Sequence, residues 1–515
     1  MRSVANADTY TPVQVKSVPW VFAALLFDEA LASLDETIVS TALPTVVGEL
    51  GGVDHMLWVV TVYVLACTLV MPVVGKVGDL IGRRGLFLAS QVLFMVGSIV
   101  CGAAPDMVAL VVGRAIQGIG GGGLLVLSQA IVADIIPARK RAFYLNLMGV
   151  GWALPMLVGP LLGGFFTDVV GWRWAFWVNV PFTALSVIIC AIFLPIYPQH
   201  KSLRHFDVWG MVTIAAAVVC MTLATSWGGV AYGWDSPVIL GLLGATVLFA
   251  VLFVLAERKA AEPIMPLFLF KNRNFLLTTL GGFIILFAMM ASMSYLPTYF
   301  QLAHGMNATA AGYMEVPMSI AYFVASLVSG WLISKRGKYK KIMVASFVIA
   351  TAGALLLCTL TADISVFFVG LYLTIMGFGM GLSFEVLVLI VQNEFPAQIV
   401  GTATGATNFF REIGTTLGAS VAGAVFTGRL TALLGERLAE HGGMDQLGID
   451  VNSLTPAFVR SLPDEVQQVI AGSYNDAIVP MFMLMVPLTI AAGLMMAALK
   501  ERPLAKTNEE QGGDI

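Results

Sequence analysis

The fold is decided by residues 56–84, which read MLWVVTVYVLACTLVMPVVGKVGDLIGRR. Residues 56–75 are almost all apolar, and a run of about 20 apolar residues is what a helix needs to cross a hydrocarbon core about 30 Å thick. Glycines and three basic residues follow at once, in residues 76–84. An apolar run that ends in a tight, basic connection predicts a helix that stops at a membrane surface.

The same pattern extends over most of the chain. Of its 515 residues, 58% are hydrophobic and 11% are charged, whereas soluble domains carry about 25% charged residues. A net charge of -3 gives no reason to expect a nucleic-acid partner. We therefore expect an all-α integral membrane protein. The apolar runs predict about 14 spans, near 20–44, 56–75, 86–104, 107–132, 143–167, 174–195, 207–228, 236–256, 275–301, 309–333, 341–361, 364–391, 399–428 and 478–499.

The basic residues support an even number of spans. Lys and Arg collect in the cytoplasmic loops of membrane proteins, and with the N-terminus inside, 22 of the 28 basic residues fall in the predicted inner segments. An odd count would scramble this distribution. We expect a multi-pass protein of the cell membrane with both termini in the cytoplasm. The stretch before Trp20 lacks the pattern of a cleaved signal peptide, so the first run is expected to be retained.

Two similar segments predict an internal repeat. Gly75 to Arg84 reads GKVGDLIGRR, and Gly330 to Tyr339 reads GWLISKRGKY. Repeats of this kind are typical of transporters. We expect a six-helix bundle in residues 1–200, two inserted helices in 201–260, and a second six-helix bundle in 261–515. An outer loop is expected at 429–477, where residues 462–470 predict a short amphipathic helix that either caps a cavity or only connects two spans.

Acidic residues inside the first run are the main functional candidates, because a charge at the centre of a membrane helix costs at least about 2.5–3.5 kcal/mol. Asp28 and Asp35 are seven residues apart and share one helix face, and Glu29 and Glu36 repeat that spacing on the neighbouring face. Such a column is suited to exchanging protons with water, and we expect Asp35 to reach a water-accessible chamber. For Asp28 and Glu29, pairing with a basic side chain near the surface is the alternative.

Arg114, in the fourth run, is a permanent cation that needs an acceptor. It either controls when a first-run carboxylate releases its proton or only joins two helices. In the second half, Glu315, Glu385, Arg411 and Glu412 are the ionisable candidates for a substrate cavity, with Arg411 and Glu385 as a neutralising pair.

Three further groups carry weaker hypotheses. Met293 and Tyr295 either line an adaptable cavity or pack in the core. In the fifth run, Gly159, Pro160, Gly163 and Gly164 suit a helix that flexes. Residues 118–123, GIGGGG, contain G-x-G-x-x-G but follow no strand, so close helix packing explains them better than nucleotide binding.

No enzyme is expected. The chain has no Walker loop, no zinc-spaced histidine cluster and no nucleophile motif. All five cysteines lie in apolar runs, which argues against a redox or metal role. We expect neither a cofactor nor a metal. The partners are protons, a small molecule and the lipid bilayer.

These motifs resemble the major facilitator superfamily, and specifically its 14-span drug:proton antiporter branch, the QacA/EmrB-like group. The resemblance covers nearly the whole chain. It implies that Asp35 is the proton-coupling acid and that Asp79 and Arg83, with Gly75 and Gly82, latch the cytoplasmic side. The matching segments are LDETIVSTALP at 34–44, the loop at 75–84, Arg114 with Gly118, WRWAFWVNVP at 172–181, VQNEFP at 391–396 and FFREIG at 409–414.

Two features depart from that branch. Pro155 stands where its fifth-span motif usually has glycine, and Asp28 and Glu29 stand where apolar residues are usual. The leading hypothesis is proton-driven efflux of lipophilic, cationic drugs by a bacterial monomer, with antibiotic resistance as its consequence. Transport of one specific metabolite or lipid, including uptake by symport, is the alternative. A non-transporting membrane sensor is disfavoured because buried charges would then serve no purpose.

Overall fold

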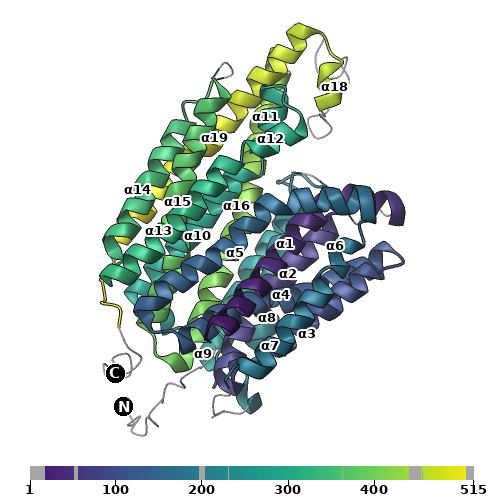
Figure 1. The fold of residues 1–515 in the computed structure, drawn as a ribbon. Helices are drawn as coiled ribbons and strands as arrows, with labels where there is room; N and C mark the ends of the chain where they lie inside the picture. Colours follow the sequence, from purple (N-terminus) through teal and green to yellow (C-terminus); the bar gives the residue numbers. More distant parts are fainter. Residues whose placement is uncertain are drawn as a thin grey trace.

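In the residues that it describes, the computed structural model has helices as its only regular elements (Figure 1). It describes residues 18–51, 56–195, 203–229, 231–361, 364–439, 454 and 456–505. The elements are α1 (Val18–Leu50), α2 (Met56–Ile81), α3 (Arg83–Gly102), α4 (Met107–Ile135), α5 (Ala138–Phe165), the π-helix η2 (Phe166–Val170), α6 (Trp174–Trp177), α7 (Asn179–Phe193), η3 (Leu203–His205), α8 (Val208–Trp227), α9 (Pro237–Lys259), η4 (Leu269–Lys271), α10 (Arg273–Met293), α11 (Leu296–Ala303), α12 (Ala308–Tyr313), α13 (Val316–Arg336), α14 (Lys340–Leu357), α15 (Val366–Glu394), η5 (Ala397–Ile399), α16 (Val400–Arg437), α18 (Pro456–Arg460) and α19 (Asp464–Ala497).

Twelve helical segments of the described chain are long and apolar enough to cross a membrane. The structure therefore supports twelve of the about 14 spans predicted from the sequence. The other two predicted runs, near 20–44 and 143–167, are helical as α1 and α5, but they are not among the twelve. Five acidic side chains lower the mean hydropathy of α1.

Two predicted spans of the second bundle are interrupted helices. The run near 275–301 forms α10 and α11 with a break at Ser294 and Tyr295, and the run near 309–333 forms α12 and α13 with a break at Met314 and Glu315. Pro297 and Pro317 lie in the first turns of α11 and α13. Proline suits a first turn because its missing N–H is not needed there.

The expected outer loop is shorter than predicted. Helix α16 continues to Arg437, and α19 begins at Asp464 and runs without interruption into the last span. The short amphipathic helix expected at residues 462–470 is thus the first part of α19. Asp464 and Glu465 occupy its first turn, where acidic side chains favour the helix dipole. Residues 440–453 and 455 lie outside the described chain.

The helices group into two bundles that meet along two seams. In the first bundle, residues 18–195, α1 packs on α5, and α4 packs on α2 and α3. In the second, residues 273–505, α10 packs on α16, and α15 packs on α13 and α14. Helices α8 and α9 form a hairpin, and α8 packs on α2 and α16. We call the α2–α16 contact the first seam and the α5–α13 contact the second seam (Figure 1).

Both seams are closed at one end of the molecule, where Arg83 and Arg139 lie; we call this the basic end. At the first seam Arg83 Nη2 donates to the Ala397 carbonyl (2.8 Å). At the second seam Arg139 Nε donates to the Ser334 carbonyl (2.8 Å). Farther from this end, Ser329 Oγ donates to Asn146 Oδ1 across the second seam (3.0 Å). Polar side chains therefore join the bundles directly in this conformation.

Candidate functional site

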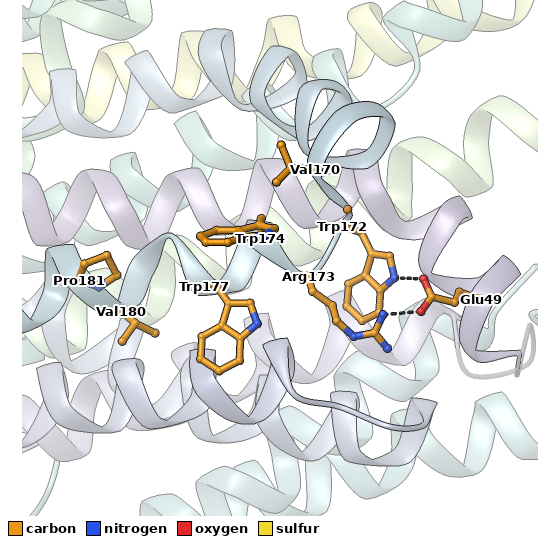
Figure 2. A pocket seen from close by; sticks show the side chains of 9 residues that line it. Glu49, Val170, Trp172, Arg173, Trp174, Trp177, Val180 and Pro181 are labelled. Carbon is orange, nitrogen blue, oxygen red and sulfur yellow. Dashed lines mark hydrogen bonds and ion pairs between the residues drawn. The ribbon is translucent and has the colours of Figure 1, made fainter.

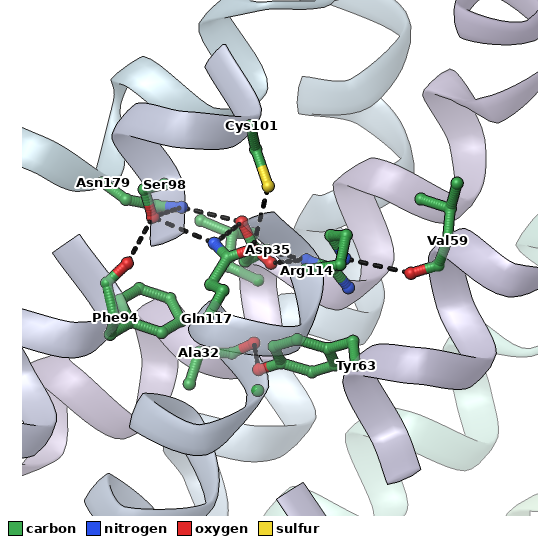
Figure 3. A network of polar contacts seen from close by, with 12 residues as sticks. Ala32, Asp35, Val59, Tyr63, Phe94, Ser98, Cys101, Arg114, Gln117 and Asn179 are labelled. Atoms are coloured by element: carbon green, nitrogen blue, oxygen red, sulfur yellow. Dashed lines mark hydrogen bonds and ion pairs between the residues drawn. The ribbon is translucent and has the colours of Figure 1, made fainter. Parts of the chain in front are cut away.

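The best-defined site is an ion pair between α1 and α4 (Figure 3). Arg114 Nη1 donates to Asp35 Oδ2, and both side chains are fully buried. Arg114 also donates through Nε to the Val59 carbonyl (3.1 Å), and its guanidinium lies 4.0 Å from the centre of the Tyr63 ring. Arg114 therefore has the acceptor that its charge requires, and this acceptor is Asp35.

Neutral polar side chains complete this site. Gln117 Nε2 and Asn179 Nδ2 donate to Asp35 Oδ1 at 2.8 and 2.7 Å, and Gln117 Nε2 also donates to Ser98 Oγ at 2.9 Å (Figure 3). The sequence analysis did not single out these three groups. Their only signal is a polar residue in an apolar helix, which is common.

The expectation that Asp35 reaches a water-accessible chamber is not met in this conformation. Its side chain points into the first bundle rather than toward lipid, and none of it is exposed. Three donors, from Arg114, Gln117 and Asn179, occupy its two oxygens. Proton exchange at Asp35 therefore requires another conformation.

Asp28 occupies a second buried site on the same helix. Its Oδ2 accepts hydrogen bonds from Gln91 Nε2 and Ser186 Oγ, both at 2.7 Å. Its Oδ1 is buried and has no hydrogen-bond partner. Among the described residues no cation pairs with Asp28, so the alternative of a nearby basic partner is wrong for this residue.

Glu29 takes part in a cluster that joins the two bundles. It is 4% exposed and interacts electrostatically with Glu385 of α15 and Arg411 of α16. Arg411 Nη1 donates to Asn408 Oδ1 (3.1 Å), and its guanidinium lies 3.9 Å from the centre of the Phe384 ring. The predicted Arg411 and Glu385 pair is close enough to interact, but its charged atoms form no direct ion pair within the described chain. Two carboxylates thus lie within electrostatic range of one guanidinium.

Glu36 and Glu412 are the half-buried acids of the group. Glu36 follows Asp35 on α1, and Glu412 follows Arg411 on α16, so they come from opposite bundles. Each carboxylate is within electrostatic range of the other. They are the acids of this region that keep partial exposure, which suits a place where substrate and water enter.

Met293, Tyr295 and Glu315 lie apart from these acids, at the two helix breaks of the second bundle. The Tyr295 ring packs on Phe426 at 5.0 Å between centroids. Glu315 is half-buried, and its Oε1 is buried without a hydrogen-bond partner. The structure therefore does not bring all predicted cavity residues into one site.

The predicted latch residues lie at the first seam. Asp79 Oδ2 accepts hydrogen bonds from the Thr402 amide (2.6 Å) and hydroxyl (2.7 Å) at the start of α16. Arg83 Nη2 donates to Asp79 Oδ1 (2.7 Å), and Arg83 Nη1 pairs with Asp134. Asp134 was missed because it falls just beyond the predicted fourth run.

The predicted glycines have different structural reasons. A side chain at Gly75 would meet the Gly401 carbonyl oxygen at 2.3 Å across the first seam, and Gly82 has a φ of 98° at the turn between α2 and α3. Gly159 and Gly163 face Thr37 and Thr41 of α1 too closely for a side chain.

A side chain at Gly164 would meet nothing within 4 Å, and Pro160 is exposed within α5. Nothing in the structure indicates flexing at these two positions. The glycines of residues 118–123 contact α2 and α3 closely, which confirms the packing explanation for that run.

A cavity of about 660 Å³ lies away from all these acids, beside the C-terminal end of α1 (Figure 2). Trp172, Trp174 and Trp177 line it, and Glu49 accepts hydrogen bonds from Trp172 Nε1 (2.7 Å) and Arg173. The positive and negative charges of this cavity balance each other.

Comparisons with known proteins agree with the helical fold. The multidrug transporter protein MdtP of Bacillus subtilis is 35% identical over 473 residues, covering 89% of this chain and 86% of the relative. Multidrug resistance protein 3 of the same organism is 32% identical over 511 residues, covering 98% of this chain and 99% of the relative. An uncharacterised transporter of Mycobacterium tuberculosis is 35% identical over 490 residues, covering 95% of this chain and 70% of the relative.

Solved structures support the architecture alone, because their sequence identity is low. The proton:xylose symporter XylE aligns with a TM-score of 0.62 at 13% identity, over 95% of this chain and 98% of that one. The human organic anion transporter MFSD10 aligns with a TM-score of 0.59 at 18% identity, over 91% and 99%. The family model described as Major Facilitator Superfamily matches residues 25–419. The chain therefore belongs to the Major Facilitator Superfamily and is a membrane transporter, not an enzyme.

Proposed function

We propose that this transporter is a proton-coupled antiporter that exports lipophilic, cationic small molecules. The observation that carries the proposal is the set of buried carboxylates on α1. Asp28 is 1% exposed and, among the described residues, forms no ion pair with a cation, and Glu29 is 4% exposed and has only the more distant Arg411, which also interacts with Glu385. An unpaired buried charge is costly, and a bound proton removes that cost without a change in fold.

Asp35 would be the acid that links proton binding to conformation. Arg114 neutralises it in the closed arrangement seen here. A proton on Asp35 would weaken that pair, and the bundles would rock about the seams, as alternating access requires. Asp79, Arg83 and Asp134 would latch the basic end during one half of the cycle.

The proposed substrate class rests on charge and on the relatives. Glu36 and Glu412 come from opposite bundles and keep partial exposure, and the described residues offer them no ion pair. A cationic substrate would complement two such carboxylates. The two Bacillus subtilis relatives are named for multidrug transport and resistance, which agrees with a broad rather than a single substrate.

We further propose 14 spans, with α1 and α5 joining the twelve apolar helices. Both carry exposed apolar side chains suited to lipid contact, such as Phe27 (40%) on α1 and Leu161 (61%) on α5. The basic end would face the cytoplasm of a bacterial cell, because most of the basic residues lie in the loops predicted for that side. The domain limits remain residues 1–200, 201–260 and 261–515, in a monomer.

The proposal is tested in sealed vesicles that contain the full chain at a known orientation. A proton gradient is imposed, and movement of a fluorescent lipophilic cation is followed for the wild type and for Asp35→Asn. We expect cation movement against the proton flow in the wild type and none above background in the variant. Undiminished transport by Asp35→Asn would remove this residue from the coupling role.

The same vesicles separate antiport from symport. For either direction of the gradient, an antiporter moves its substrate against the proton flow, whereas a symporter moves its substrate in the same direction as the protons. Co-directional movement would support uptake of a specific metabolite, the alternative that the unusual Pro155 and the extra acids motivate.

A further inference from the structure

The two seams are related by the internal repeat but differ in charge. Residues 75–84 align with 330–339 without a gap, so Gly75 corresponds to Gly330 and Asp79 corresponds to Ser334. The contacts follow this correspondence. A side chain at Gly75 would meet the Gly401 carbonyl oxygen of α16, and one at Gly330 would meet the Ala142 carbonyl oxygen of α5.

Acidic groups balance the basic side chain of the first seam. Asp79 and Asp134 both contact Arg83, and Asp79 also binds the start of α16 across the seam. The second seam has Ser334 in place of the bridging acid. Direct contacts there come instead from Arg139, which donates to the carbonyl groups of Ser334 and Lys335.

A cavity of about 380 Å³ opens at this second seam, and its lining contains two cations and no acid. Lys140 of α5 and Lys335 of α13 are both exposed and belong to opposite bundles. Among the described residues neither lysine forms an ion pair. Lys335 Nζ lies 5.0 Å from the centre of the Trp331 ring. Closing this seam therefore brings two like charges to one site, where an anion would relieve their repulsion.

The surroundings of the cavity point to a lipid. Trp331 and Phe143 line it and are 53% and 38% exposed, and aromatic side chains of this kind gather at headgroup depth. From Trp331 the exposed apolar side chains of α13 continue away from the basic end, with Val328 (38%), Val324 (43%) and Ile320 (53%). These positions give the acyl chains an apolar path beside the seam.

We propose that this cavity binds the phosphate headgroup of an anionic phospholipid, which bridges Lys140 and Lys335 and stabilises the closed second seam. The lipid phosphate supplies the negative charge that Asp79 supplies at the first seam. Basic pockets between transmembrane helices are suited to such headgroups, and a ligand that binds one conformation preferentially shifts the population toward it. The cavity beside Glu49 and Arg173 differs because its ion pair is already complete (Figure 2).

The test uses the full chain in bilayer nanodiscs of phosphatidylethanolamine with or without phosphatidylglycerol. Native mass spectrometry counts the retained lipids, and thermal unfolding reports the stabilisation. The variant is Lys140→Gln with Lys335→Gln. The matched control is Lys259→Gln with Lys271→Gln, which removes the same charge from two exposed lysines at α9 and η4, outside the cavity.

We expect the wild type and the control to retain phosphatidylglycerol and to unfold at a higher temperature in its presence. The cavity variant should bind it roughly 30-fold more weakly, as two lysines at about 1 kcal/mol each imply, and should lose that stabilisation. Equal retention by the cavity variant and the control would overturn the proposal.

Two further outcomes would also overturn it. If inorganic phosphate stabilises the wild type in phosphatidylethanolamine as much as phosphatidylglycerol does, the site takes a free anion rather than a lipid. If the wild type gains nothing from phosphatidylglycerol while Glu509→Gln with Glu510→Gln makes it responsive, the chain's own acidic C-terminal residues occupy the site. Neither outcome depends on transport, so the test is independent of the proposed antiport.

Discussion

Asp35 of α1 and Arg114 of α4 lie in direct contact, and neither side chain has any exposed surface. They are 79 residues apart in the chain, and the contact joins α1 to the α2–α3–α4 group that packs beside it. A buried ion pair adds little net stability, but removing only one partner leaves an uncompensated charge. The contact therefore makes the first bundle sensitive to the charge on Asp35.

Asp35→Asn should destabilise the protein more than the double variant Asp35→Asn with Arg114→Gln. The single change leaves a buried guanidinium without its carboxylate, a loss of about 3–5 kcal/mol, whereas the double change leaves two neutral amides. Thermal unfolding in detergent measures the order. Asp235→Asn, at an exposed position, is the control and should stay within about 0.5 kcal/mol of the wild type. A double variant less stable than the single one would contradict this account.

In the cluster of Glu29, Glu385 and Arg411, loss of the base should lower the melting temperature more than loss of one acid does. Arg411→Gln leaves two interacting carboxylates with no cation, so the melting temperature should fall sharply at neutral pH. Glu385→Gln leaves one acid and one base and should be tolerated. Adding Glu385→Gln to Arg411→Gln should recover part of the loss.

Thermal unfolding of the three variants checks this order, with exposed Glu436→Gln as the control. If Glu385→Gln and Arg411→Gln destabilised the protein equally, the two carboxylates would not be competing for one guanidinium. The double variant then would show simple additivity, as expected for independent sites.

The sequence predicted the charged residues of the site but not the neutral ones around them. Asp35 and Arg114 stand out because charge is rare in apolar runs, and each needs a partner. Gln91, Ser186 and Asn179 give no such signal, since a hydroxyl or amide in a helix is easily satisfied by the backbone. Their roles as donors to Asp28 and Asp35 appear only when α1, α3 and α7 are packed together.

The span pattern was predictable because the bilayer fixes the length of an apolar run. The breaks near Tyr295 and Glu315 were missed, although Pro297 and Pro317 mark the first turns of the new helices. The contacts across the seams could not be predicted from the sequence. Asp79 and Thr402 are 323 residues apart, and no spacing rule relates them.

Gly75→Ala should open the first seam. The new methyl group would lie 2.3 Å from the Gly401 carbonyl oxygen and 3.0 Å from its carbon, and backbone atoms can move away only if α2 and α16 separate. Overpacking of this kind costs about 1–3 kcal/mol. Hydrogen exchange should therefore become faster at the Gly401 and Thr402 amides, which Asp79 binds in the closed seam.

Gly85→Ala is the matched control for that change. Gly85 lies in the first turn of α3, and a side chain there would meet nothing within 4 Å. Exchange at α16 should stay at the wild-type rate. If both variants left the two amides equally protected, the close approach of Gly75 would not limit the seam.

His304 predicts a pH dependence of stability that does not involve the buried acids. It follows α11, outside the candidate spans, and its Nε2 lies 3.2 Å from Tyr299 Oη, which donates to Asn475 Oδ1 (3.1 Å). Burial lowers the pKa of His304 below its usual value of 6.5. The unfolded chain therefore takes up a proton at a higher pH than the folded chain does, so this contribution to stability is present above about pH 6.5 and is lost as the pH falls below it.

The wild type should consequently lose more thermal stability between pH 7.5 and pH 5.5 than His304→Gln, which keeps an N–H donor near Tyr299 but cannot titrate. His205→Gln, at an exposed position, is the control and should behave as the wild type does. Other groups that titrate over this range act in all three proteins, so the difference between their slopes isolates His304. Equal slopes for the wild type and His304→Gln would show that protonation of His304 costs the folded state nothing, and the Tyr299 contact would then tolerate the imidazolium.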